Sequence, residues 1–373
     1  MKPILFFIFC GFTTLLSAQE KKPVYSIVEE IHDKSWYETQ LDLWEKEAKE
    51  GSKSANAWYN YYAASRALLN LSVGDERTQY KELGKTITDE LLKVHPDSFE
   101  ANYVAMWSSG LSGKDMGYLW KAYEIEPNDP RLYDDLLIHY EMEWDNPKRA
   151  DMAEKMIQSN YLAPGVMNWG YNVLAEIEEY GVILSVGDND TYALWLNKYG
   201  LNHRTDVTIL NIHMLFLEEY RDKYFNKLGI PLIDVEGVTL NDMIAHVMKN
   251  TKDATVHIAT TAYHCVEDVT LDSNLYLTGL TYQYSEDPLD NHSLIRRNFE
   301  QRYALDYLKV KFSCHRMDQI ATSFDATYLA AMVKLYKMYK TAGEKEKMED
   351  LSVLMEKASE YSHMAEEIQK IIH

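Results

Sequence analysis

The hydrophobic pattern of this chain changes period at about residue 180. Before that point, apolar and aromatic residues recur every three or four positions, which is typical of amphipathic helices. After it, short β-branched runs alternate with helical segments, and the pattern becomes helical again beyond residue 310. The pattern predicts a helical domain over 20–180, an α/β domain over 181–310 and a C-terminal helical segment over 311–373, which contains a helical hairpin with its turn at Gly343.

Proline-containing turns divide the first half at similar intervals. Pro96, Pro127 and Pro164 lie 31 and 37 residues apart, and each precedes a helical segment that carries Tyr or Trp. A helix pair of this size cannot bury its own apolar face, so neighbouring pairs must stack. The spacing therefore predicts an N-terminal solenoid of helical hairpins.

The segment 118–156 resembles a tetratricopeptide repeat. The small residue, the turn and the packing positions of that family match Ala122, 127–130, Tyr133, Leu136 and Tyr140. The resemblance implies a concave surface that binds a protein partner; the alternative is a solenoid that only supports the second domain. The many aromatic residues could stack on sugar rings, but their helical spacing favours packing between hairpins.

The second half contains four predicted strands, at 182–186, 206–212, 254–262 and 274–285, the last with an antiparallel pairing as an option. Helices are predicted over 192–199, over a segment that ends at Gly229, and over 239–250. Nearly continuous apolar strands that alternate with helices indicate a mostly parallel sheet covered on both faces, an α/β sandwich.

Five polar or turn-forming residues follow the first strand: Gly187, Asp188, Asn189, Asp190 and Thr191. In an open α/β sheet, ligands bind at the carboxyl ends of the strands. This loop, with Asn211 and His213 at the end of the next strand, is therefore a candidate site for sugar hydroxyls, or for a divalent cation at Asp188 and Asp190. The alternative is structural, because Asp and Asn are also good turn and helix-capping residues.

Two His/Cys dipeptides, His264-Cys265 and Cys314-His315, could supply four ligands to zinc, although their spacing is not that of known zinc sites. Cys265 and Cys314 could instead form a disulfide or remain buried thiols. The sequence has no phosphate loop, nucleophile elbow or dinucleotide fingerprint, so no cofactor is predicted apart from the optional cation.

Residues 1–19 have the pattern of a cleavable signal peptide. Lys2 precedes an apolar run from Ile4 to Leu16, which includes Cys10, and small residues near Ala18 suit cleavage. The run is short for a membrane span; a retained anchor is the alternative. We expect a periplasmic or secreted protein that does not insert in the membrane after cleavage. The net charge of −20 opposes binding to nucleic acid or anionic lipid.

Residues 180–360 resemble the soluble C-terminal region of bacterial multi-pass membrane proteins described as protein O-mannosyltransferase-like, with a glycosyltransferase-C-type membrane half. The shared residues are 187–192, Leu194, Trp195, Asp206, Val207 and Asn211, whereas Ala193 replaces the usual proline. The presumed glycosyl transfer belongs to the membrane half, which this sequence does not contain. The resemblance therefore implies an exported accessory module and speaks against an independent glycosyltransferase.

These patterns predict a non-catalytic exported interaction protein, possessing helical repeats that bind a protein partner and an α/β domain that binds a small polar ligand or serves as a platform. One alternative is an enzyme acting on envelope glycans, with Asp188 and Asp190 as acid/base or cation-binding groups. Another is a glycan-binding module without turnover.

Overall fold

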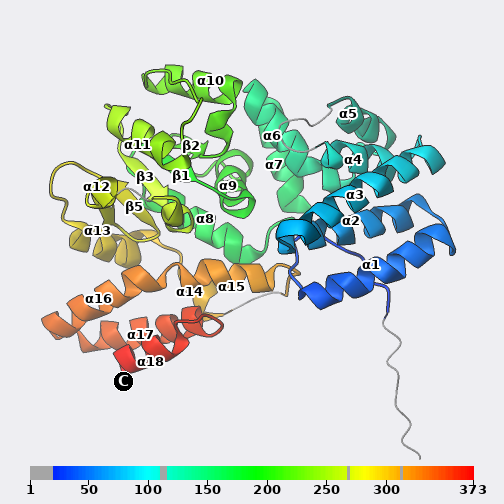
Figure 1. Cartoon of the computed structure of the whole chain (residues 1–373). Helices are drawn as coiled ribbons and strands as arrows, with labels where there is room; N and C mark the ends of the chain where they lie inside the picture. The colour runs from blue at the N-terminus through cyan, green and yellow to red at the C-terminus, as the bar shows by residue number, and fades with distance from the viewer. Residues whose placement is uncertain (1–19, 110–115, 267–268, 311–313) are drawn as a thin grey trace, which may run out of the picture. The chain divides into compact units, whose positions relative to one another are not determined.

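The computed structural model describes residues 20–109, 116–266, 269–310 and 314–373, so the predicted signal peptide, 1–19, lies outside the described residues. The described chain forms an α-rich α+β fold with a five-stranded sheet (Figure 1). Its contacts define two compact units. The helical unit holds the described residues up to Ile125 except 26–31, and the sheet unit holds 26–31 and the described residues from Glu126 onward.

The contact boundary therefore follows Ile125, whereas the predicted domain boundary follows Tyr180. Three helices assigned by sequence to the first domain group with the sheet instead: α6 (Tyr133–Glu143), α7 (Asn146–Gln158) and α8 (Pro164–Glu176). Compact units need not fold independently, so the domain limits stay a prediction.

The helical unit consists, in its described part, of α1 (Lys34–Lys49), α2 (Ala55–Leu71), α3 (Gly74–Val94), α4 (Phe99–Ser108) and α5 (Met116–Ile125). Consecutive helices pack against one another. The hydroxyl of Ser54 accepts a hydrogen bond from the amide of Ala57 and so begins α2, and Ser98 begins α4 in the same way. The turn at 95–97 separates α3 from α4, as predicted.

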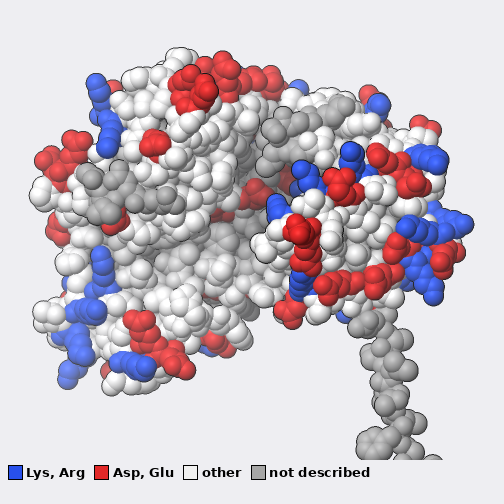
Figure 2. Space-filling view, viewed as in Figure 1, with Lys and Arg blue, Asp and Glu red and all other residues white. Residues whose placement is uncertain are grey.

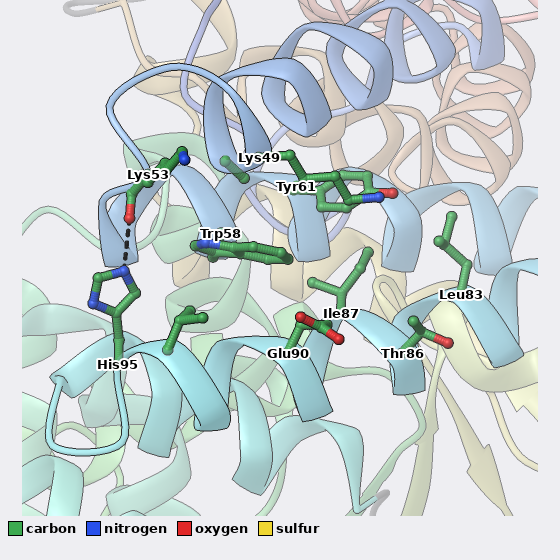
Figure 3. A pocket seen from close by; sticks show the side chains of 11 residues that line it. Lys49, Lys53, Trp58, Tyr61, Leu83, Thr86, Ile87, Glu90 and His95 are labelled. Atoms are coloured by element: carbon green, nitrogen blue, oxygen red, sulfur yellow. Dashed lines mark hydrogen bonds between the residues drawn. The ribbon is translucent and has the colours of Figure 1, made fainter.

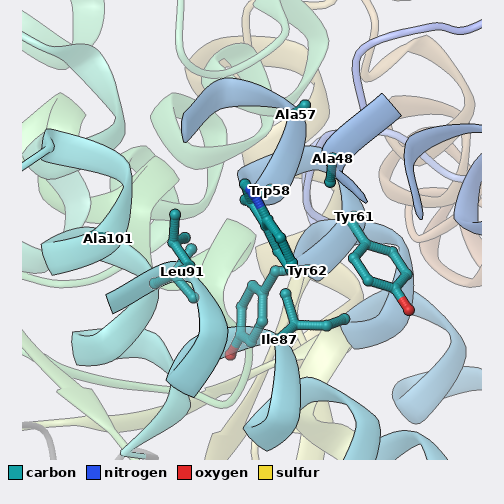
Figure 4. Packing of buried hydrophobic residues seen from close by; sticks show 9 residues of the cluster. Ala48, Ala57, Trp58, Tyr61, Tyr62, Ile87, Leu91 and Ala101 are labelled. Carbon is teal, nitrogen blue, oxygen red and sulfur yellow. The ribbon is translucent and has the colours of Figure 1, made fainter. Parts of the chain in front are cut away.

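The core of the helical unit is aromatic. Trp58, Tyr61 and Tyr62 of α2 pack with Ile87 and Leu91 of α3 (Figure 4). Trp58 is 5% exposed and Tyr61 is 2% exposed. Because these rings are buried, the aromatic stripe of α2 serves packing between helices.

The sheet has the strand order β2-β1-β3-β5-β4 and is mixed. β1 (Val182–Ser185) pairs in parallel with β2 (Thr208–Asn211) and with β3 (Val256–Ala259). β4 (Leu275–Leu277) and β5 (Thr281–Tyr284) form an antiparallel pair, and β5 also pairs antiparallel with β3. Every residue of β1, β2 and β3 is buried, which explains why the strands are mostly apolar, although they also carry the buried polar residues Asn211 and His257.

Two strand predictions need correction. The segment 274–285 is not one strand, because the chain turns between β4 and β5. The third strand ends at Ala259, and 254–262 continues into η5 (Thr260–Cys265). The sheet therefore has more and shorter strands than the sequence predicted, and the antiparallel pairing that was an option for 274–285 is present.

The sheet unit contains further helices. They are η2 (Pro130–Leu132), α9 (Asp188–Trp195), η3 (Leu196–Gly200), η4 (Met214–Phe216), α10 (Glu218–Leu228), α11 (Leu240–Asn250), α12 (Val269–Asp272), α13 (Asn291–Arg297), η6 (Asn298–Arg302), α14 (Asp306–Lys309), α15 (Asp318–Ala326), α16 (Leu329–Ala342), α17 (Lys345–Ser359) and α18 (Ala365–Ile372). Gly229 and Gly343 end α10 and α16 in left-handed conformation, as predicted.

Among the described residues, no helix is long and apolar enough to cross a membrane. On the face drawn in Figure 2, Asp and Glu side chains lie interspersed with Lys and Arg. This agrees with the spread of acidic residues along the sequence.

Candidate functional site

The carboxyl ends of β1 and β3 form the topological switch point of the sheet. β1 lies between β2 and β3, and both of these strands follow it in sequence. The connection from β1 therefore leads to β2 on one side of β1, and β3 is added later on the other side. Open α/β sheets bind ligands at such a point, outside the carboxyl ends of the strands. The predicted loop 187–191 starts at this edge, and so does Thr260 after β3.

Most of 187–191 is helix, which corrects the predicted loop. Gly187 is the N-cap of α9, and Asp188 to Thr191 form the first turn of this helix, four residues before its predicted start. Acidic residues in a first turn are favoured by the helix dipole. Gly187 and Asp188 are exposed, whereas Asp190 and Thr191 are buried.

The Asp190 carboxylate forms hydrogen bonds within the sheet unit. Its side chain is 2% exposed, and its carboxylate accepts hydrogen bonds from the amide of Val186 at 3.1 Å, the amide of Thr191 at 2.9 Å and the hydroxyl of Thr261 at 2.8 Å. Burial raises the pKa of Asp190, although these donors oppose the rise. The carboxylate thus joins the start of α9 to the segment after β3.

Thr191 and Asn211 form a second closed network beside Asp190. The Thr191 hydroxyl donates to the carbonyl of Gly187 at 2.6 Å and accepts from Asn211 Nδ2 at 2.9 Å. Asn211 Oδ1 accepts from the amide of Met214, the first residue of η4. His213 is exposed and takes no part in this network.

Asp188 and Asp190 do not act as a pair, because one faces solvent and the other is buried. Asn189 lies between them and donates through Nδ2 to the carbonyl of Val28 at 2.9 Å, which ties the segment 26–31 to α9. Across the described ranges, no group of three or more His, Cys, Asp or Glu side chains is placed to hold a metal ion.

The two His/Cys dipeptides also stay apart from each other. Within the described residues neither Cys265 nor Cys314 forms a disulfide, and Cys314 is exposed. Cys265 Sγ lies 3.5 Å from Nε2 of its neighbour His264. His315 Nε2 donates to the carbonyl of Asn160 at 2.8 Å, and its Nδ1 accepts from the amide of Met317. Both ring nitrogens of His315 are therefore already engaged.

A buried carboxylate that sequence analysis missed lies at the end of α8. Glu176 is 1% exposed and accepts hydrogen bonds from the amide of Leu280 at 2.8 Å and from the hydroxyls of Thr278, Thr281 and Tyr303. Burial raises the pKa of Glu176 to about 7. The only sequence signal is one acidic residue on an apolar helix.

His257 of β3 continues this network. Because the Thr281 hydroxyl donates to Glu176, it accepts from His257 Nδ1 at 2.8 Å. The opposite ring nitrogen, Nε2, is buried without a partner among the described residues. Burial and the nearby Arg297 lower the pKa of His257 to about 3, so the imidazole is neutral.

The helical unit carries an open groove of about 610 Å³ between α1, α2 and α3, here named the α1–α3 groove (Figure 3). Its lining residues are Ala48, Lys49, Lys53, Trp58, Tyr61, Leu83, Thr86, Ile87, Glu90, Val94 and His95. The floor is apolar, and Lys53 and His95 lie together at one end. This volume is within the range of small-ligand sites.

The family model described as TMEM260-associated domain 2 matches residues 166–229. This stretch begins in α8, includes β1, α9 and β2, and ends at the glycine that closes α10. It therefore contains four of the buried polar residues described above, Glu176, Asp190, Thr191 and Asn211, but not His257. No curated protein matches the chain.

Proposed function

We propose that this protein is an exported, non-catalytic interaction protein whose helical unit binds a protein partner in the α1–α3 groove. One observation carries the proposal. The buried polar side chains of the sheet edge, Asp190, Thr191 and Asn211, are hydrogen-bonded within their own unit. The groove instead presents an apolar floor beside polar groups, such as Lys53 Nζ, that have no partner among the described residues. An open apolar concavity with a few polar groups is the usual form of a binding site.

The finer parts of the proposal rest on separate observations. A tetratricopeptide-like stacking of the helices is supported by the packing of consecutive helices from α1 to α5. Export to the periplasm is supported by the sequence of residues 1–19. An accessory role in envelope glycan or glycoprotein handling is supported by the resemblance at 180–360.

The alternative, a glycan-acting enzyme or a glycan- or cation-binding module that uses Asp188 and Asp190, has less support. A carboxylate that accepts three hydrogen bonds in the interior has little capacity left for a ligand. A role for Asp188 alone would need partners from another element.

A photo-crosslinking amino acid tests the proposal inside the producing cells. We place it at Val94, which lines the groove and is 47% exposed, or at Val353 on α17, which is 51% exposed. The two positions match in residue type and exposure. We expect a discrete adduct with one partner protein from position 94 and none from position 353. Equal patterns from both positions, or no adduct from position 94, would contradict the proposal.

A further inference from the structure

Lys53 is held in a fixed and uncommon backbone conformation at one end of the α1–α3 groove. Its φ is 54°, in the left-handed region that few residues other than glycine adopt. Two hydrogen bonds hold it there: its amide donates to the carbonyl of Glu47 at 3.1 Å, and its own carbonyl accepts from His95 Nε2 at 2.6 Å. The backbone from which the ammonium extends is therefore fixed before any partner arrives.

Two donors at this end of the groove are unused. Lys53 Nζ and Trp58 Nε1 make no ion pair or hydrogen bond within the described residues. Figure 3 shows the nitrogen end of the Trp58 indole directed toward Lys53 and His95. The Trp58 indole N–H is not among the fully buried donors without a partner, so it is open to the groove, where a ligand atom can accept from it.

Apart from Lys53 and Glu90, the groove is mostly apolar, and its other lysine, Lys49, is already paired. Ile87 is buried in its floor and Val94 is exposed at its rim. Lys49 pairs with Glu45 at 2.7 Å, so its charge is balanced within α1. Glu90 is an acidic residue of α3 that also lines the groove. Lys53 is thus the lysine of the groove without an ion pair among the described residues, on a chain whose net charge is −20.

We infer that the α1–α3 groove binds an extended segment of a partner protein that carries an aliphatic side chain next to a carboxylate. The carboxylate accepts hydrogen bonds from Lys53 Nζ and Trp58 Nε1, and the aliphatic side chain lies against Ile87 and Val94. Charge complementarity selects this occupant, because hydrogen bonds to a charged group are the strong ones. The inference rests on the proposed function and adds the chemistry of the partner.

Fluorescence anisotropy with the full chain and three labelled peptides tests the inference. The first probe is Gly-Ser-Leu-Asp-Ser-Gly amide, the second has Asn for Asp, and the third has Ser for Leu. We expect the first probe to bind about tenfold more tightly than either of the others. Equal binding of the Asp and Asn probes would overturn the inference.

Substitutions in the protein test whether the tighter binding of the Asp probe arises in the α1–α3 groove. Lys53→Gln is expected to weaken the Asp probe about tenfold. Lys46→Gln removes the same charge from an exposed position on α1 outside the groove and leaves binding unchanged. Glu90→Gln removes the acidic residue of the groove and tightens binding about threefold. Unchanged binding by Lys53→Gln, with an unchanged melting temperature, would overturn the inference.

Two further outcomes separate this inference from the proposed function. If position 94 captures a partner in cells but no probe binds selectively, the proposed function stands and the carboxylate inference fails. If sedimentation velocity shows self-association that Val94→Glu abolishes, the occupant is a second copy of this chain and the inference also fails.

Discussion

At the sheet edge, buried polar side chains are hydrogen-bonded within their own unit, whereas in the α1–α3 groove two donors lack an acceptor among the described residues. At the sheet edge, Asp190 and Thr191 satisfy amides and hydroxyls of their own unit and are buried. In the groove, Lys53 and Trp58 keep donors that nothing in the described chain accepts. A polar motif that stands out in the sequence, such as 187–191, can therefore stabilise the fold. Residues that form no sequence motif, such as Lys53 and Trp58, can be brought together by helix packing to form an open site.

The largest expected effect is on stability and concerns Asp190. Asp190→Ala should lower the free energy of unfolding by roughly 3–5 kcal/mol, because two amides and a hydroxyl lose a charged acceptor in the interior. Chemical denaturation measures the loss. Asp188→Asn, at an exposed position of the same helix turn, loses only the interaction with the helix dipole and should change stability by less than about 1 kcal/mol.

The opposite result would break the comparison between the two regions. If Asp190→Ala left stability unchanged, the carboxylate would not be a structural group. If Asp188→Asn abolished binding of a glycan or cation at an unchanged melting temperature, the sheet edge would be a ligand site.

A second stability effect is expected at Gly279, in the turn between β4 and β5. A Cβ at this position would collide with the hydroxyl of Tyr303 and the carboxylate of Glu176. Gly279→Ala should therefore cost roughly 2–3 kcal/mol, measured by denaturation. Gly237 also has positive φ but nothing within 4 Å, so Gly237→Ala should cost only about 1 kcal/mol. Equal costs would mean that the Glu176 network adapts easily.

Local features were predicted from sequence better than distant ones. Gly229 and Gly343 act within a few residues of themselves, so the helix ends at these positions followed from residue type. The first two strands were predicted because each is a short apolar run that is buried on both faces.

Contacts between distant segments could not be predicted in this way. Asp190 meets Thr261, which is 71 residues away, and Glu176 meets Thr281, which is 105 residues away. No local pattern encodes either distance. For the same reason, the sequence marked 187–191 as polar but could not tell a ligand site from a closed network, and it did not predict a groove lined by three helices.

The smallest expected effect concerns the pH dependence of stability. It tests whether the Glu176–His257 network excludes water, so that both groups keep their shifted pKa values. The folded pKa of Glu176 is raised from 4.5 to about 7, so this group contributes stability at low pH that is lost as pH rises from 4.5 through 7. The folded pKa of His257 is lowered from 6.5 to about 3, so it contributes stability above pH 6.5 that is lost as pH falls. Between pH 5 and 6.5 the two contributions have opposite slopes of roughly 1.4 kcal/mol per pH unit.

Single variants should separate the two slopes. In Glu176→Gln only the His257 contribution remains, so unfolding free energy should rise relative to the parent chain as pH increases from 5 to 6.5. In His257→Gln only the Glu176 contribution remains, so the free energy of unfolding should fall relative to the parent chain over the same pH range. Denaturation at several pH values measures both differences. If both variants kept the pH profile of the parent chain, water would reach the network, and the contrast between a closed sheet unit and an open groove would weaken.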